Sequence, residues 1–131
     1  MPTYNDGCYL IDALASIERC QFPKTELIVV NDGSSDPTTL RTLAGLESQG
    51  YYVVHKTNGG LSAARNTAIA ASRGRYVLPL DADNKIRPDY VRAAVELLDR
   101  EPNVGVVYGD RQLFGSSKEL VLVPEYDIPN L

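Results

Sequence analysis

Apolar residues along the chain fall into two kinds of pattern that alternate with each other. Short continuous runs, typical of strands covered on both faces, occupy residues 27–30, 51–55, 75–80, 104–108 and 120–123. Between these runs, apolar residues recur at helical spacing in residues 10–17, 40–46, 61–72 and 91–98. This alternation predicts an α/β fold, a three-layer sandwich with a mostly parallel central sheet.

The beginning of the chain does not fit this alternation. Residues 1–5 come directly before the first helical stripe, where a βαβ fold requires a strand. Only Met1 is available for that strand, so we expect neighbouring strands to keep unpaired N–H and C=O groups. An exposed sheet edge is a template for pairing, and we therefore expect that the chain can self-associate through it.

Length and charge narrow the function classes. A chain of 131 residues predicts a single domain, residues 1–131. The net charge is −4 and no stretch is rich in Lys and Arg, which argues against a nucleic-acid partner. No apolar run approaches the roughly 18 residues of a membrane span.

The two cysteines, Cys8 and Cys20, indicate the compartment. If the segment between them is helical, they are separated by about 18 Å of rise. A disulfide requires Cα atoms within about 7 Å, so we expect free thiols and a cytoplasmic protein. A membrane anchor elsewhere in a longer parent protein, at the inner membrane face, stays open.

Three loops follow predicted strands, and in a parallel sheet the ligand lies beyond the carboxyl ends of the strands. They are the 31–37 loop, the 57–60 loop and residues 81–84, which we expect to line one cleft. Asp81 and Asp83 would point the same way in extended chain, with Cα atoms about 6.6 Å apart. Oxygen ligands of this kind suit Mg²⁺ or Mn²⁺. The simpler interpretation is a solvated loop in which Asp83 caps a turn.

The companion loops carry further candidates, each with a simpler alternative. Asp32 could accept a hydrogen bond from a ligand N–H, or it could be a turn residue. Gly59 and Gly60 precede a helix N-terminus, which attracts phosphate. Arg65 lies one turn further on and could reach an anion or form a structural salt bridge with a nearby Asp. Tyr4 could stack on a flat base or simply pack near the terminus.

Four motifs in order, PTYN, VVNDGSSD, NGGLSAARN and LDADN, make the chain resemble the inverting glycosyltransferases of family 2. The resemblance extends from Pro2 to about Tyr108. It implies the GT-A fold and a nucleoside diphosphate sugar donor, most often a uridine one. It also implies a divalent metal, Mn²⁺ or Mg²⁺, that bridges the Asp-x-Asp motif and the diphosphate. The acceptor, whether glycan, lipid or protein, is not indicated.

The resemblance also assigns roles to residues, motif by motif. It implies these positions: Pro2, Thr3 and Tyr4 at the base, Asp32 accepting from the base N–H, Gly59, Gly60 and Arg65 beside the nucleoside and diphosphate, Asp81 at the ribose and metal, and Asp83 as metal ligand. In this family the general base is a carboxylate in a later segment. Because the chain stops at Leu131, we expect a fragment of a longer glycosyltransferase, incomplete for catalysis.

Two other functions compete with this one. The chain could be a nucleotide-sugar-binding remnant without turnover. It could also be a phosphotransferase of the haloacid dehalogenase type, which has a strand ending in Asp-x-Asp. That family expects Thr or Val two residues after the second Asp, where this chain has Lys85, and its motif normally opens the domain.

Overall fold

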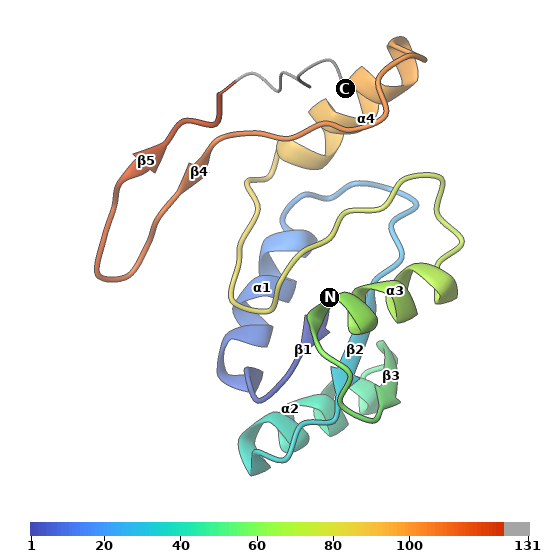
Figure 1. Cartoon of the computed structure of the whole chain (residues 1–131), viewed down its shortest axis with the longest axis vertical. Helices are drawn as coiled ribbons and strands as arrows, with labels where there is room; N and C mark the ends of the chain where they lie inside the picture. The colour runs from blue at the N-terminus through green and yellow to red at the C-terminus, as the bar shows by residue number, and fades with distance from the viewer. Residues whose placement is uncertain (125–131) are drawn as a thin grey trace. The chain divides into compact units, whose positions relative to one another are not determined.

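The computed structural model describes residues 1–124, which form two compact units, Met1–Ala93 and a second unit that begins at Ala94. The elements are β1 (Pro2–Thr3), α1 (Gly7–Glu18), β2 (Ile28–Asp32), α2 (Pro37–Ser48), β3 (Tyr52–Lys56), α3 (Leu61–Ala71), α4 (Tyr90–Arg100), β4 (Arg111–Gln112) and β5 (Leu120–Val121) (Figure 1). Helix α4 contains the boundary between the two units. A single domain over residues 1–131 stays a prediction.

The first unit is built on a parallel sheet of three strands in the order β1–β2–β3. The central strand β2 is buried along its whole length. Because side chains alternate along a strand, Val29 packs into one apolar cluster while Ile28 and Val30 pack into another. Helix α3 contacts β2, and α1 packs against α2. The predicted α/β sandwich with a parallel sheet is therefore confirmed.

The two apolar clusters lie on opposite faces of the sheet. The larger cluster contains Met1, Leu10, Ala13, Leu14, Val29, Leu43, Leu46, Leu80 and Ala82. The smaller one is formed by Ile28, Val30 and Ala64, with Val54, Ala68 and Ala71 packed against it. Small alanines at helical spacing allow α3 to lie close to β2. These clusters fix the positions of the strand ends from which the site is built.

Helices α1 and α2 meet at a close backbone contact. Asp36 caps the N-terminus of α2, because its carboxylate accepts from Thr39 N at 2.7 Å and from Thr39 Oγ1 at 2.8 Å. These hydrogen bonds lower the pKa of Asp36. Thr39 Oγ1 in turn accepts from Gly7 N at 2.9 Å. A Cβ on Gly7 would lie 2.4 Å from Thr39 Cα, so only glycine fits at the start of α1.

The expectation that no strand precedes the first helix is wrong. Pro2 and Thr3 pair with Val30 and Asn31 in parallel register. Met1 extends this pairing, since its amine donates to Ile28 O at 2.7 Å and its carbonyl accepts from Val30 N at 2.8 Å. Two residues are too few to show a strand pattern in the sequence. Both β1 and β3 are sheet edges, and self-association through an edge stays a prediction.

The strands expected at residues 75–80 and 104–108 are absent from the described chain. Backbone groups of successive strand residues point to opposite sides, and those of Met1 point to β2. Those of Pro2 therefore face the outer edge, where proline has no N–H to donate. At this edge β1 offers only the Pro2 carbonyl, so it cannot form a ladder of hydrogen bonds with residues 75–80. Leu80 is nevertheless buried in the larger cluster.

The second unit contains one antiparallel hairpin. β4 and β5 pair through Arg111↔Val121 and Gln112↔Leu120. The predicted strand at residues 120–123 is thus confirmed at Leu120–Val121, whereas β4 was not predicted. Residues 104–108 have no strand partner among residues 94–124, and Val106 is 77% exposed. None of the helices in residues 1–124 has the length and hydropathy needed to cross a membrane.

The contact between Gly7 and Thr39 can be tested with two glycine substitutions. We expect Gly7→Ala to lower the free energy of unfolding by about 1–3 kcal/mol, because the new methyl group overlaps the α2 backbone. Gly45→Ala is the matched control inside α2, where a Cβ meets nothing within 4 Å. It should raise stability by about 0.5–1 kcal/mol through helix propensity. Urea denaturation measures both, and equal stability of Gly7→Ala and wild type would contradict the contact.

Candidate nucleotide-binding site

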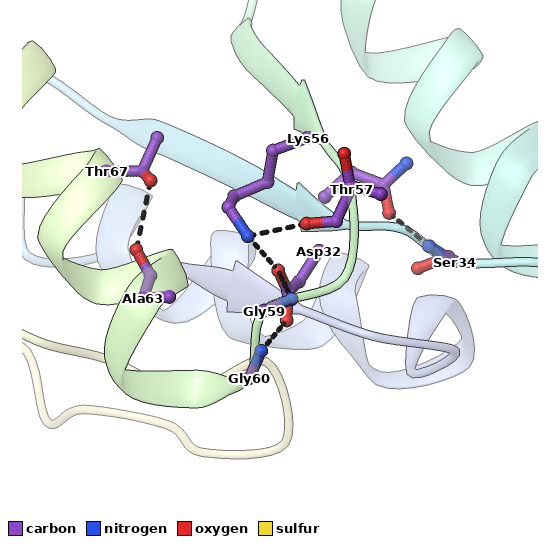
Figure 2. A network of polar contacts seen from close by, with 9 residues as sticks. Asp32, Ser34, Lys56, Thr57, Gly59, Gly60, Ala63 and Thr67 are labelled. Carbon is purple, nitrogen blue, oxygen red and sulfur yellow. Dashed lines mark hydrogen bonds and ion pairs between the residues drawn. The ribbon is translucent and has the colours of Figure 1, made fainter.

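The carboxylate of Asp32 lies at the carboxyl end of β2 and joins two of the predicted loops. It is 3% exposed. Its Oδ1 accepts from Gly59 N at 3.0 Å and from Lys56 Nζ at 2.5 Å, and its Oδ2 accepts from Gly60 N at 2.8 Å (Figure 2). Lys56 Nζ also donates to Thr57 O at 2.7 Å. The side chain of Asp32 therefore holds the 57–60 loop against the end of the central strand.

These contacts determine the charge of Asp32. The hydrogen bond from Lys56, together with the backbone N–H groups of Gly59 and Gly60, holds the pKa of Asp32 below its usual 3.8 although desolvation opposes this. A carboxylate has about four acceptor positions, and three are in use here. One position on Oδ2 is left, which is enough for a single further N–H.

The 31–37 loop reaches the 57–60 loop because Gly33 has no side chain. Gly33 has φ 75°, and a Cβ there would lie 2.7 Å from Asn58 N. Asn5, itself at φ 59°, holds the other side of the 31–37 loop. Its Oδ1 accepts from Ser35 N and Asp36 N, both at 2.9 Å. The PTYN motif and two of the three predicted loops are therefore physically joined.

The PTYN residues differ in exposure. Pro2 and Thr3 are buried in the sheet, whereas Tyr4 is 49% exposed. Thr3 Oγ1 is a buried polar atom with no hydrogen-bond partner among the described residues. Arg65 Nε is in the same condition. Buried polar atoms nearly always have a partner in folded proteins, so both atoms mark this region as unusual.

Arg65 and Asp81 form an ion pair. Arg65 Nη2 donates to both carboxylate oxygens of Asp81, at 2.7 and 2.9 Å, and both side chains are about one-third exposed. The structural salt bridge anticipated for Arg65 is therefore present. Gly60 is the N-cap of α3 and Arg65 lies in its second turn. The Asp32 and Asp81 contacts thus converge on the N-terminal end of one helix.

The pair also lies near the chain start. Burial lowers the pKa of the Met1 amine from 8.0 to about 6, and the charges of Asp81 and Arg65 act on that amine in opposite directions. Met1 and Ala82 also belong to the same apolar cluster, so the 81–84 turn lies near the chain start, and one shared cleft stays a prediction.

Asp83 lies in a turn rather than in extended chain. Asn84 N donates to Asp81 O at 3.1 Å, which closes the 81–84 turn. The expected extended geometry of Asp81 and Asp83 is therefore wrong. Asp83 is exposed, and its side chain has no hydrogen-bond or ion-pair partner within residues 1–124. No group of three or more His, Cys, Asp or Glu side chains gathers into a metal site in the described part of the chain.

Two side chains of the site were missed in the sequence. Lys56 contacts Asp32. The two residues stand opposite each other at the ends of β2 and β3, and this pairing becomes visible only once the strand register is known. Asn31 is the second missed side chain: its Nδ2 donates to His55 Nδ1 at 3.0 Å, and its Oδ1 accepts from Ser34 N at 2.9 Å.

A separate open cavity, lined by residues that include Ile17, Phe22 and Tyr51, contains none of the predicted site residues.

Comparison with known proteins identifies the family. The sequence model of glycosyl transferase family 2 matches residues 1–126. The chain belongs to glycosyl transferase family 2. Family membership removes the haloacid dehalogenase alternative and confirms the family to which the motifs pointed.

Individual proteins similar to this chain agree with its membership of family 2. Glycosyltransferase GlyA of Streptococcus pneumoniae is 38% identical over 70% of this chain. Poly-beta-1,6-N-acetyl-D-glucosamine synthase of Staphylococcus epidermidis is 30% identical over 89% of it. The crystal structure of S. aureus TarS 1–349 in complex with UDP-GlcNAc matches with a TM-score of 0.66 and 34% identity over 76% of this chain, which confirms the GT-A fold. The chain spans only 13%, 29% and 30% of these three proteins, respectively.

The Asp32 contacts predict how stability depends on pH. Because its pKa is lowered in the folded state, Asp32 stabilises the fold above its unfolded pKa, and this contribution is lost as pH falls through the folded pKa. Asp32→Asn should therefore unfold at lower urea than wild type at pH 7, and the difference should shrink below about pH 4. The other carboxylates with lowered pKa are present in both proteins and cancel.

Asp83→Asn is the control, because its side chain is exposed and unpaired within residues 1–124. It should unfold at the wild-type urea concentration at pH 7. An Asp32→Asn protein with the wild-type midpoint at pH 7 would show that the carboxylate does not hold the loop.

Proposed function

We propose that this family 2 chain is the donor-binding part of an inverting glycosyltransferase and that it binds a uridine diphosphate sugar together with a divalent metal. The observation that carries the proposal is the convergence of Asp32, at the end of β2, and Asp81, in the 81–84 turn, on the N-terminal end of α3. TarS has been solved with UDP-GlcNAc and with UDP, and it shares 34% identity with this chain. The family relationship therefore supports this class of donor.

The N-terminus of α3 suits the diphosphate. The helix is capped by Gly60 without a side-chain hydrogen bond, and its first intrahelical bond joins Ala64 N to Gly60 O at 3.0 Å. The N–H groups of residues 61–63 precede this bond and have no acceptor within the helix. Such a helix end attracts anions, and the glycines before it permit close approach.

The base would lie between Tyr4 and Asp32. Tyr4 is 49% exposed, so a flat base can stack on its ring. The remaining acceptor position on Asp32 Oδ2 suits the N3–H of uracil. The buried Thr3 Oγ1, unpartnered within the described residues, lies in the same motif and supports a polar ligand here.

The carboxylates fit a metal that takes its other ligands from the substrate. Mg²⁺ and Mn²⁺ commonly use one or two carboxylates together with phosphate oxygens and water. Asp83 is exposed and unpaired in residues 1–124, and Asp81 is oriented by Arg65. When bound, the metal would supply positive charge beside the leaving diphosphate. Two carboxylates are too few to hold such a metal by protein ligands alone, so the substrate and water would complete the site.

The acceptor and the general base are not assigned to any residue in the described chain. A nucleotide-sugar-binding domain without turnover is therefore the second candidate, and radiolabelled sugar transfer to a panel of acceptors separates the two. A cytoplasmic location agrees with the two free cysteines, Cys8 and Cys20, and stays part of the proposal.

The metal is tested by titrating the chain with UDP in a calorimeter. UDP should bind more tightly with Mn²⁺ than with EDTA, and Asp83→Ala should abolish the difference without changing the affinity measured in EDTA. Glu47→Gln, which removes another partly exposed carboxylate, should keep the wild-type response. Equal affinity of the wild-type chain for UDP with Mn²⁺ and with EDTA would refute the metal.

The base pocket is tested with a modified nucleotide rather than with an Asp32 variant, because Asp32 also holds the loop. N3-methyl-UDP lacks the N–H that Asp32 would accept. It should bind at least about tenfold more weakly than UDP, since the carboxylate is left without its partner. Competition against a fluorescent UDP analogue measures the ratio, and equal binding of the two nucleotides would place the base elsewhere.

A further inference from the structure

A stripe of polar side chains on α1 runs beside the segment that follows the 81–84 turn. Asp12 and Ser16 of α1 are four residues apart, so they lie on one side of the helix, and Cys20 comes four residues later, just past the helix end. Each contacts one of three consecutive residues, 85–87. The contacts are Lys85 Nζ to Asp12 Oδ2 at 2.6 Å, Ile86 N to Ser16 Oγ at 3.2 Å, and Cys20 Sγ to Arg87 O at 3.5 Å.

Ser16 is the most deeply buried of the three side chains. It is 0% exposed, and its hydroxyl donates to Ala13 O at 2.6 Å while it accepts from Ile86 N. The Asp12–Lys85 pair is solvent-exposed, and pairs of that kind contribute little. The Cys20 thiol is a weak donor. A buried serine that satisfies a backbone N–H is therefore the main polar link between α1 and residues 85–87.

The residues before Asp83 are also held by α1. Leu80 and Ala82 are buried in the larger cluster together with Leu10, Ala13 and Leu14 of α1. The 81–84 turn is thus fixed to α1 before and after Asp83. Because the Asp83 side chain has no partner of its own within residues 1–124, its position depends on this backbone attachment.

We propose that Ser16 is a positioning residue that fixes the 81–84 turn and, through it, the carboxylate of Asp83 at the metal. The part concerning the metal rests on the proposed function. Metal sites require their ligands to be held to within about 0.5 Å by surrounding groups. Ser16 supplies this support from α1 through Ile86, which follows the C-terminal end of the turn.

Ser16→Ala tests the proposal, since alanine is compatible with the helix and removes only the hydroxyl. In the ligand-free chain, the amide of Asn84, which closes the turn, should exchange hydrogen faster than in wild type. In the UDP-saturated chain, Mn²⁺ affinity measured by electron paramagnetic resonance should fall by about tenfold, as when groups that orient metal ligands are removed. UDP affinity in EDTA should not change.

Ser48→Ala is the matched control. Ser48 in α2 donates to Gly45 O at 2.7 Å, the same three-residue spacing as in Ser16, and makes no contact with residues 85–87 among those described. It should leave both measurements at wild-type values.

The outcomes separate the two proposals. Wild-type exchange at Asn84 in Ser16→Ala would overturn the positioning role, and so would a loss of UDP affinity that is equal with Mn²⁺ and with EDTA. If wild type itself showed no response to Mn²⁺, the proposed metal would fail. Asn84 exchange would then still decide whether Ser16 fixes the turn.

Discussion

The arrangement of the site depends on one buried carboxylate at the end of the central strand. Asp32 cannot be left without partners at 3% exposure, and it obtains them from Lys56 and from the N–H groups of Gly59 and Gly60. This requirement draws the 57–60 loop onto the strand and thereby sets where α3 begins. The start of α3 in turn determines the position of Arg65, which orients Asp81. The polar site is thus a consequence of satisfying one charge.

The two sides of the proposed site differ in how firmly the fold holds their side chains. The side proposed for the base is organised by the fold itself, because Asn5 joins the PTYN motif to the 31–37 loop and Gly33 lets that loop approach Asn58. On the side proposed for the metal, the backbone is anchored to α1 while the Asp83 carboxylate stays exposed. Under the proposed function, the nucleoside would bind to preformed groups, and the Asp83 carboxylate would be left for a metal and the diphosphate to engage together.

Much of this arrangement was predictable from sequence. The apolar runs at β2 and β3 and the helical stripes of α1, α2 and α3 were predicted correctly, since each is long enough to show its period. The meeting of the 31–37 and 57–60 loops followed from the parallel sheet. The motif resemblance led to the family that the comparison then confirmed.

The predictions that were wrong or missing depend on contacts between distant parts of the chain, which the pattern of neighbouring residues does not show. Strand β1 is two residues long and shows no periodicity, yet its Pro2 presents an edge that cannot donate. Residues 75–80 therefore stayed unpaired despite a clear apolar run. The role of Lys56 depends on its register with Asp32 across two strands, and the role of Ser16 depends on a contact 70 residues away in sequence. Neither relationship can be read from neighbouring residues.

The central claim is that a uridine nucleotide binds where Asp32 joins the 57–60 loop to the start of α3. A titration of the ¹⁵N-labelled chain with UDP, followed by NMR, tests it most directly. The account predicts that the largest amide shifts fall on Gly59, Gly60 and residues 61–63. Shifts centred instead on the separate cavity lined by residues that include Ile17, Phe22 and Tyr51 would contradict it.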